Sequence, residues 1–186
     1  MNNKAVFLDR DGVINVDRSY VYRVEDFDFM DGIFDFCRHA KSLGYKLVVV
    51  TNQSGIGRGY YSEDDFSQLT HWMKQQFIAN QCDIDGVYFC PYHPEKALPP
   101  YLKNSDWRKP APGMLLQAIQ DFGLDATQSI MIGDRETDMQ AAMAAQVGRK
   151  ILLDADQFNA DQFNADQHSS CADEVWPNLM AGLKSL

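Results

Sequence analysis

The sequence has few cysteines and no long apolar run. Its 4 cysteines, at positions 37, 82, 90 and 171, follow no spacing of a disulfide framework, so we expect reduced thiols. No apolar run approaches the roughly 20 residues that a membrane-spanning helix requires. Asn2, Asn3 and Lys4 lead directly into an apolar stretch, which is unlike the start of a signal peptide. We therefore expect a cytoplasmic protein with no membrane partner.

Positive charge is also scarce. The 186 residues include 17 Lys and Arg against 26 Asp and Glu, a formal net charge of −9. This balance argues against nucleic acid as a partner, because binding a phosphate backbone requires clustered lysine and arginine. A small phosphorylated ligand would need cations placed locally. With 45% hydrophobic residues the chain can form one substantial core, and we expect a single domain over residues 1–186 and a monomer.

Short apolar stretches alternate with segments of helical periodicity. Strands are expected at residues 4–8, 45–50, 87–89, 129–132 and 151–153. Helices are expected at residues 33–43, 62–77, 114–122, 135–146 and 176–186. This alternation is typical of an α/β fold with a doubly wound parallel sheet. The polar and aromatic residues 16–31 are interpreted as a flap over one edge of that sheet.

Two other stretches are interpreted as loops. Residues 53–61 carry alternate glycines, which indicate a mobile loop more than a phosphate cradle, since no lysine-serine pair follows them. The sequence Ala-Asp-Gln-Phe-Asn occurs at 155–159 and again at 160–164. So short a period fits no stacked repeat, and residues 155–170 are predicted to form a surface loop.

The first expected strand ends at two carboxylates, Asp9 and Asp11, with Gly12 after them. Ligands bind at the carboxyl edge of a parallel sheet, so a side chain placed there can meet a substrate on a rigid backbone. The plainer interpretation is that Asp9 and Asp11 are turn formers, since Asp and Gly favour turns for local reasons.

Other strand ends carry polar groups that suit phosphoryl transfer. These are Thr51-Asn52, Lys109-Pro110, and Gly133-Asp134 followed by Asp138. With Asp9-x-Asp11-Gly12-Val13, they resemble the motifs of the haloacid dehalogenase-like (HAD) phosphatase superfamily. More narrowly, residues 7–15 and 51–59 resemble the D-glycero-D-manno-heptose 1,7-bisphosphate and histidinol-phosphate phosphatases. The similarity runs from about residue 4 to about residue 154.

The resemblance implies a HAD-like fold without a separate cap domain and a magnesium-dependent phosphatase that acts through an aspartyl-phosphate. Carried over position by position, Asp9 would be the nucleophile and Asp11 the general acid and base. The Mg²⁺ ligands would be the Asp9 carboxylate, the Asp11 backbone carbonyl and Asp134. Magnesium prefers oxygen ligands and can bridge a carboxylate and a phosphate.

The same resemblance assigns the remaining motif residues. Thr51 and Asn52 would bind the transferred phosphoryl group, and Lys109 would neutralise its charge. Asp138 would orient Lys109 or the metal. Taken alone, Thr51 is equally well explained as a strand-end cap, and Asp138 as a complement to the helix dipole.

Arginines give the strongest hint about the substrate. Arg108 precedes Lys109, and in the heptose phosphatase pattern this arginine points to the distal part of the substrate. Arg10, Arg58 and Arg135 are further candidates to hold a second phosphate, although each is equally well explained as solvated surface.

These features favour a sugar bisphosphate as the small phosphorylated metabolite. We favour the 7-phosphatase reaction on heptose 1,7-bisphosphate, in lipopolysaccharide precursor synthesis. Histidinol phosphate or another small phosphate ester is the alternative.

The resemblance fails at one loop. The heptose phosphatases usually hold zinc there with three cysteines and one histidine, but this chain has only Cys90 in place. Tyr92, Ser105 and Trp107 occupy the other ligand positions, and His93 is one residue away. Because structural zinc normally needs four ligands, we predict no structural zinc, and we interpret Cys90 and His93 as a packed pair.

Two other classes of protein fit the sequence less well than a phosphatase does. A phospho-receiver module is also doubly wound, but its acceptor aspartate lies on a central strand and its acidic metal partners at an earlier strand end. Here Asp9 follows the first strand and Asp11 comes two residues later, which suits hydrolysis. A catalytically inactive binding protein is disfavoured because every motif residue is present.

Overall fold

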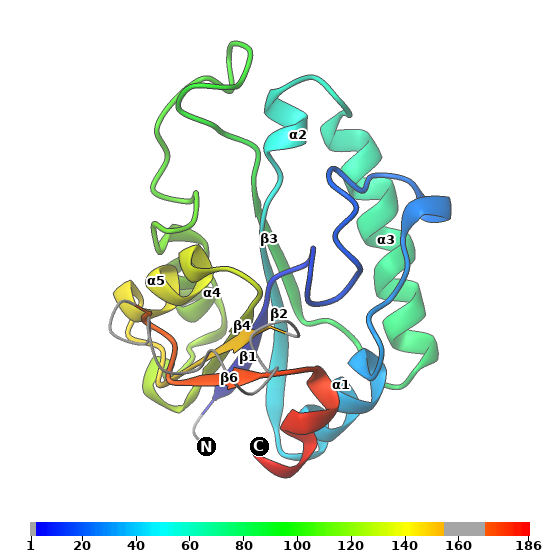
Figure 1. Ribbon diagram of the computed structural model, residues 1–186, viewed down its shortest axis with the longest axis vertical. Coiled ribbons are helices and arrows are strands. Elements are labelled where there is room, and N and C mark those ends of the chain that lie inside the picture. Colours follow the sequence, from blue (N-terminus) through cyan, green and yellow to red (C-terminus); the bar gives the residue numbers. More distant parts are fainter. Residues whose placement is uncertain (1–2, 155–169) are drawn as a thin grey trace, which may run out of the picture.

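The computed structural model describes residues 3–154 and 170–186. The Ala-Asp-Gln-Phe-Asn repeat, and with it almost all of the predicted surface loop, lies outside the described residues. The chain forms a six-stranded sheet in the order β3-β2-β1-β4-β5-β6, and every neighbouring pair is parallel. This arrangement confirms the predicted doubly wound α/β fold (Figure 1).

The elements follow the predicted order. The strands are β1 (Lys4–Leu8), β2 (Tyr45–Asn52), β3 (Gly86–Cys90), β4 (Ile130–Gly133), β5 (Arg149–Leu153) and β6 (Glu174–Trp176). The α-helices are α1 (Ile33–Ser42), α2 (Ser54–Gly57), α3 (Glu63–Ala79), α4 (Gly113–Phe122) and α5 (Glu136–Ala144). Short 3₁₀ helices cover Val24–Asp26, Ala126–Gln128 and Leu179–Lys184.

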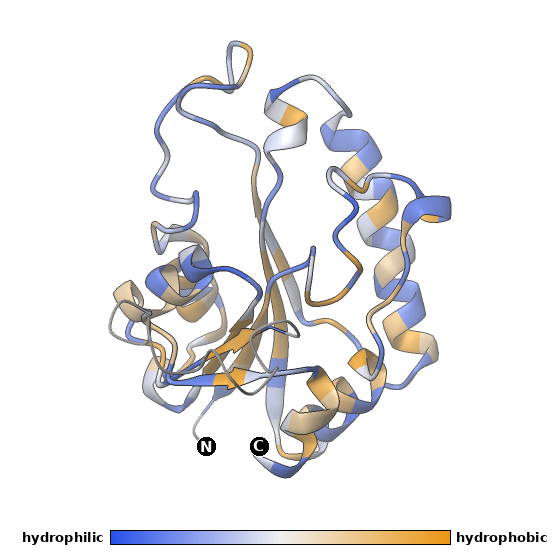
Figure 2. Ribbon diagram, in the orientation of Figure 1, coloured by the Kyte–Doolittle hydropathy of each residue, from blue (hydrophilic) through white to orange (hydrophobic). Residues whose placement is uncertain are grey.

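Strand β1 lies at the centre of the sheet and is buried on both faces. Alternate side chains of a strand point to opposite faces. Val6 and Leu8 therefore join a core cluster with α1 and α3, while Ala5 and Phe7 join one with α4 and α5. Figures 1 and 2 show these helices on either side of a sheet whose central strands are apolar. The residue that follows Leu8 is thus attached to a central strand that is covered on both faces.

Helix ends follow their local sequence signals. Ser62 and Asp65 form a capping box at the start of α3, in which Asp65 N donates to Ser62 Oγ at 3.0 Å and Ser62 N donates to Asp65 Oδ2 at 2.8 Å. Helix α4 ends at Gly123, which has a φ of +58°. This left-handed conformation is accessible to glycine because it has no Cβ.

Two sequence expectations were wrong. Residues 53–61 were predicted to be a loop, but Ser54–Gly57 forms α2. A Cβ on Gly57 would lie 3.0 Å from the Tyr101 side chain, so this glycine permits close packing.

The second error lies at the C-terminus, where a short helix was predicted at 176–186 and no strand was predicted before it; the helix is present but starts later and is a 3₁₀ helix. Glu174–Trp176 forms β6, which pairs with β5, and the 3₁₀ helix covers Leu179–Lys184. The strand lies at the sheet edge and has only three residues, too few to show an alternating apolar pattern.

The order of the strands in the sheet determines where a ligand can bind. The chain runs outward from β1 through β2 to β3, then returns to the other side of β1 with β4. The carboxyl ends of β1 and β4 therefore flank a topological switch point, where ligands bind in open α/β sheets. Within the described residues, the connections between strands hold helices, the flap and loops but no separate cap domain. No described helix is both long and apolar enough to cross a membrane.

Candidate active site

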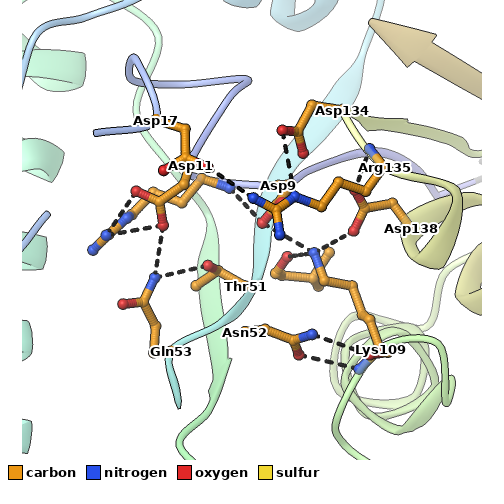
Figure 3. A network of polar contacts seen from close by, with 12 residues as sticks. Asp9, Asp11, Asp17, Thr51, Asn52, Gln53, Lys109, Asp134, Arg135 and Asp138 are labelled. Atoms are coloured by element: carbon orange, nitrogen blue, oxygen red, sulfur yellow. Dashed lines mark hydrogen bonds and ion pairs between the residues drawn. The ribbon is translucent and has the colours of Figure 1, made fainter. Parts of the chain in front are cut away.

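The polar residues predicted at four strand ends converge in space. Asp9 follows β1, Thr51 and Asn52 end β2, Asp134 follows β4, and Lys109 reaches the same edge from the loop before α4 (Figure 3). Asp9, Thr51, Asn52 and Lys109 line a cavity of about 450 Å³. Its other walls come from the flap, from α2 and from the start of α5, and Asp11 and Asp138 also line it.

Lys109 is the central cation of this edge. Its Nζ lies 2.9 Å from Asp9 Oδ1 and 2.6 Å from Asp138 Oδ1, and donates to the Val50 carbonyl at 2.8 Å. An ammonium group has three N–H donors, so these three oxygens satisfy it fully. Burial alone would lower the pKa of Lys109, but the Asp138 and Asp9 carboxylates raise it above its ordinary value. The lysine is therefore a fixed positive charge beside Asp9.

Three carboxylates gather next to this lysine. Asp9, Asp134 and Asp138 each offer a ligand atom, and these atoms all lie within 4.8 Å of one another. Burial raises the pKa of Asp9 and Lys109 opposes this effect; with the repulsion from Asp138 and Asp134 the pKa rises to about 7. Burial, followed by repulsion from Asp138, likewise raises the pKa of Asp134 to about 6. The site holds more negative charge than its own cations balance.

The donor set fits a hard divalent cation. Asp134 Oδ1 is buried and has no hydrogen-bond partner in the protein, and such orphaned oxygens normally find a ligand. Asp138 is already engaged by Lys109 and by the Arg135 N–H at 3.2 Å. Both oxygens of Asp138 are therefore occupied, whereas Asp9 is contacted at Oδ1 only and Asp134 Oδ1 has no partner, so Asp9 and Asp134 are the carboxylates that can bind a cation. All-oxygen sites suit magnesium.

Two glycines make room for these carboxylates. Gly12 has a φ of +86°, and a Cβ there would occupy the space of the Asp134 side chain. At Gly133 a Cβ would collide with Asp138 in the same way. The glycine of each motif therefore permits close approach of backbone to the acidic cluster.

Asp11 is held by donors on both oxygens. Arg10 Nη2 lies 2.9 Å from Oδ1 and 3.0 Å from Oδ2, Asn15 Nδ2 donates to Oδ1 at 3.1 Å, and Gln53 Nε2 donates to Oδ2 at 3.1 Å. Arg10 is only 2% exposed, does not line the cavity, and also donates to the Val21 carbonyl at 2.7 Å. The structure therefore places Arg10 behind Asp11 rather than among the substrate-facing arginines.

Asn52 is occupied by the main chain. Its Nδ2 donates to the Lys109 carbonyl at 3.0 Å, and its Oδ1 accepts from the Lys109 N–H at 3.1 Å. This double contact, visible in Figure 3, fixes the backbone that carries the lysine. Asn52 lines the cavity, but its polar atoms serve Lys109 in this structure.

Thr51 is 1% exposed and its Oγ1 accepts from Gln53 Nε2 at 2.9 Å. Gln53 in turn accepts from the Tyr61 hydroxyl at 2.5 Å. Burial raises the pKa of Tyr61 to about 12, so this phenol remains a donor near neutrality. Gln53, Tyr61 and Asn15 were not among the predicted site residues. Asn15 and Gln53 lie in the stretches 7–15 and 51–59 that carry the resemblance, and Gln53 follows Thr51-Asn52 directly at the end of β2, but no role was assigned to either residue.

The remaining arginines surround the cavity. Arg58 and Arg108 line it. The burial of Arg108 lowers its pKa, and the nearby positive charge of Arg58 also lowers it. Arg108 also donates to the Tyr92 carbonyl at 3.2 Å. Arg135 lines it as well, but there Nη2 lies 2.8 Å from Asp17 of the flap and Nε 3.7 Å from Asp134.

The loop at residues 90–107, for which no structural zinc was predicted, makes contacts of other kinds. His93 Nδ1 accepts from the N–H groups of Glu95 and Lys96 at 3.1 and 3.0 Å. Tyr92 and Tyr101 have ring centroids 5.9 Å apart, and Lys103 Nζ lies 4.1 Å from the Tyr92 centroid. Local hydrogen bonds and aromatic contacts thus connect the residues of this loop. The absence of zinc stays a prediction.

Comparisons with known proteins agree with this site. A model for the family described as HAD-hydrolase-like matches residues 106–180. The chain is 56% identical to D-glycero-alpha-D-manno-heptose-1,7-bisphosphate 7-phosphatase from Burkholderia mallei, over 82% of this chain and 81% of that protein. It is 48% identical to the beta-anomer 7-phosphatase from Yersinia pestis, over 80% and 79%.

A solved structure shows the same fold. The D,D-heptose 1,7-bisphosphate phosphatase of B. bronchiseptica, complexed with magnesium and phosphate, aligns with a TM-score of 0.78 at 24% identity, covering 98% of this chain and 97% of that one. The chain belongs to the HAD-like phosphatases, in the family that contains the heptose 1,7-bisphosphate 7-phosphatases.

Proposed function

We propose that this protein is a magnesium-dependent phosphatase that removes one phosphate of a sugar bisphosphate through an aspartyl-phosphate. The observation that carries the proposal is the Asp9 carboxylate at the end of a buried strand, 2.9 Å from Lys109 and beside the unpartnered Asp134 Oδ1. The substrate that the relatives favour is heptose 1,7-bisphosphate, hydrolysed at position 7. The product would enter lipopolysaccharide precursor synthesis in the cytoplasm.

The first step forms a bond between Asp9 and phosphorus. The Arg10 N–H and Lys109 Nζ both contact Asp9 Oδ1, at 2.8 and 2.9 Å, so we assign the attack to Oδ2. The phosphorus–oxygen bond to the sugar breaks, and Asp11 gives its proton to the leaving alcohol. Lys109 offsets the charge on the transferred group, and the hydroxyl of Thr51 donates a hydrogen bond to it.

The second step hydrolyses the aspartyl-phosphate. Asp11, now a carboxylate, takes a proton from water as the water oxygen attacks phosphorus. The bond to Asp9 then breaks, which releases inorganic phosphate and regenerates the nucleophile. Asp9, Asp134 and the Asp11 carbonyl would hold Mg²⁺, which reduces the repulsion between carboxylate and phosphate anions when bound. Asp138 keeps Lys109 aimed at Asp9 through their 2.6 Å contact.

The second phosphate would bind away from the reacting centre. Arg58 and Arg108 line the same cavity, and their guanidinium groups are suited to binding an anion. Arg135 is the third cation of the wall. Binding energy at a remote phosphate raises the rate when it orients the reacting group, so its loss should lower kcat as well as affinity.

The test is hydrolysis of a substrate panel with and without chelator. The panel holds both anomers of heptose 1,7-bisphosphate, fructose bisphosphate, histidinol phosphate and sugar monophosphates. We expect the highest kcat/KM for a heptose bisphosphate, and no turnover by Asp9→Asn although it remains folded. Full activity of Asp9→Asn, or of wild type in excess chelator, would contradict the mechanism.

The arginine supplies the test of substrate class. Arg108→Ala should reduce kcat/KM for bisphosphates at least about tenfold more than for monophosphates. An equal effect on both, or a preference of wild type for histidinol phosphate, would contradict the bisphosphate assignment and leave phosphate-ester hydrolysis standing.

A further inference from the structure

Gln53 lies between two residues of the proposed mechanism. It follows β2 directly, is 2% exposed, and its backbone N–H donates to the Cys90 carbonyl at 2.8 Å. Its Nε2 is 3.1 Å from Asp11 Oδ2 and 2.9 Å from Thr51 Oγ1. A primary amide has two N–H donors, so one points at the proposed acid and the other at the proposed phosphoryl-binding hydroxyl (Figure 3).

The orientation of this amide is set from its other end. The Tyr61 hydroxyl donates to Gln53 Oε1 at 2.5 Å, which fixes the oxygen away from Asp11 and Thr51. Tyr61 is itself held, because its ring stacks on that of Tyr22 with centroids 5.1 Å apart. Gly55 leaves the space that this ring occupies. An amide turned over would place its oxygen against the Asp11 carboxylate, which is repulsive.

Each bond from Gln53 has a directional consequence. Thr51 Oγ1 accepts from Gln53, so its own hydrogen points elsewhere and is available to a phosphoryl oxygen in the cavity. Asp11 Oδ2 is fixed by Gln53 while Asn15 fixes Oδ1, so the carboxylate cannot rotate freely. Catalytic groups lose rate when their geometry relaxes by small distances.

We propose that Gln53 is a positioning residue, whose amide orients the Asp11 carboxylate and the Thr51 hydroxyl together for phosphoryl transfer. This inference rests on the proposed function. It assigns Gln53 no contact with the reacting atoms, and its effect passes through Asp11 and Thr51. The two effects are separable, because only the role of Asp11 depends on the leaving group.

The leaving group therefore supplies the test. A sugar alkoxide is strongly basic and needs the proton of Asp11 to depart, whereas 4-nitrophenolate departs readily without one. The kcat/KM value reports the steps up to release of the leaving group. The ratio of kcat/KM for the best sugar phosphate to that for 4-nitrophenyl phosphate does not depend on the concentration of active enzyme. Partial unfolding of a variant thus leaves the ratio unchanged.

The experiment compares Gln53→Met and Gln53→Glu with wild type. Methionine keeps the size of the side chain without donors, and glutamate keeps the acceptor for Tyr61 but faces Asp11 with a carboxylate. We expect the ratio to fall at least about tenfold in both, since general acid catalysis is worth about 10²- to 10⁴-fold and misplacement forfeits part of it. Gln117→Met and Gln117→Glu are matched controls on α4, where Gln117 Nε2 donates to Asp121 at 2.8 Å. They should leave the ratio at the wild-type value.

Each result has one meaning. A lowered ratio in both Gln53 variants, with unchanged Gln117 controls, supports the positioning of Asp11. An unchanged ratio overturns it, even where both kcat/KM values fall. An equal loss of kcat/KM for the two esters would come from altered packing or from a displaced Thr51 hydroxyl, neither of which depends on the leaving group. If wild type hydrolyses neither ester, the proposed function fails, and this result is distinct from a failure of the inference.

Discussion

Replacement of Lys109 by methionine should destabilise the protein strongly when divalent cations are absent. Lys109 Nζ contacts Asp9, Asp138 and the Val50 carbonyl, and its side chain is 2% exposed. Removing one partner of a buried ion pair costs about 3–5 kcal/mol of unfolding free energy, because the remaining charge is left unpaired. For a chain of 186 residues this lowers Tm by between about 6 and 20 °C.

A second substitution separates charge pairing from packing. In the wild-type background, Asp138→Asn should lower the unfolding free energy by about 1–3 kcal/mol, because it removes the closest partner of Lys109. In the Lys109→Met background the same change removes an unpaired buried carboxylate, so it should raise Tm. This reversal of sign follows only if the two charges interact directly, at the 2.6 Å that separates them.

The assay is thermal unfolding of the four proteins in EDTA, followed by calorimetry or circular dichroism. The exposed Lys184→Met serves as control and should change stability by less than about 0.5 kcal/mol. Equal effects of Asp138→Asn in both backgrounds would refute the reasoning, since they would show that the pair is not coupled.

Magnesium should raise the Tm of wild type, by the equivalent of about 2.7 kcal/mol at a hundred times its dissociation constant, and should have no effect on Asp134→Asn. A Tm shift that persists in that variant would remove Asp134 from the metal site. Elemental analysis should find no stoichiometric zinc, and one zinc per chain that is lost in Cys90→Ser would contradict this. Gly12→Ala should destabilise more than Gly44→Ala and abolish the magnesium effect. Both glycines have positive φ, +86° and +82°, but only a Cβ at Gly12 meets the Asp134 side chain, whereas nothing lies within 4 Å at Gly44. Equal losses in the two variants would show that backbone strain alone matters.

The errors of sequence interpretation have a common cause. The alternate glycines at 55, 57 and 59 predicted a mobile loop, yet Gly55 and Gly57 lie in α2, where other parts of the chain approach them closely. Arg10 adjoins Asp9 in sequence, but its guanidinium turns inward to Asp11 and Val21. Local sequence states neither which neighbours surround a residue nor which way its side chain turns.

The residues of the candidate site show the same division. Asp9, Thr51 and Asp134 could be chosen from sequence because each stands at the end of an apolar strand, and parallel strands end at one edge. Lys109 was chosen with them, but it lies in the loop between β3 and α4, and only the tertiary structure brings it to that edge. Asn52 was chosen with them, but its amide atoms hold the Lys109 backbone at 3.0 and 3.1 Å. Gln53 lies in the stretch 51–59 that carries the resemblance, but no role was assigned to it. Its bonds to Asp11 and Thr51, and the bond from the Tyr61 hydroxyl to its amide oxygen, reveal both residues.

The sequence by itself determined the fold class and the chemistry of the sheet edge. Apolar strands that alternate with amphipathic helices can bury their surfaces only as a covered parallel sheet, and that arrangement brings the strand ends together. The tertiary structure decided the pairing of individual groups: Lys109 with Asp138, Asp11 with Gln53, and Asp17 of the flap with Arg135. A hydrogen bond or ion pair forms only when the distance between its two atoms is correct to within a few tenths of an ångström. For residues far apart in the chain, only the packed core fixes that distance.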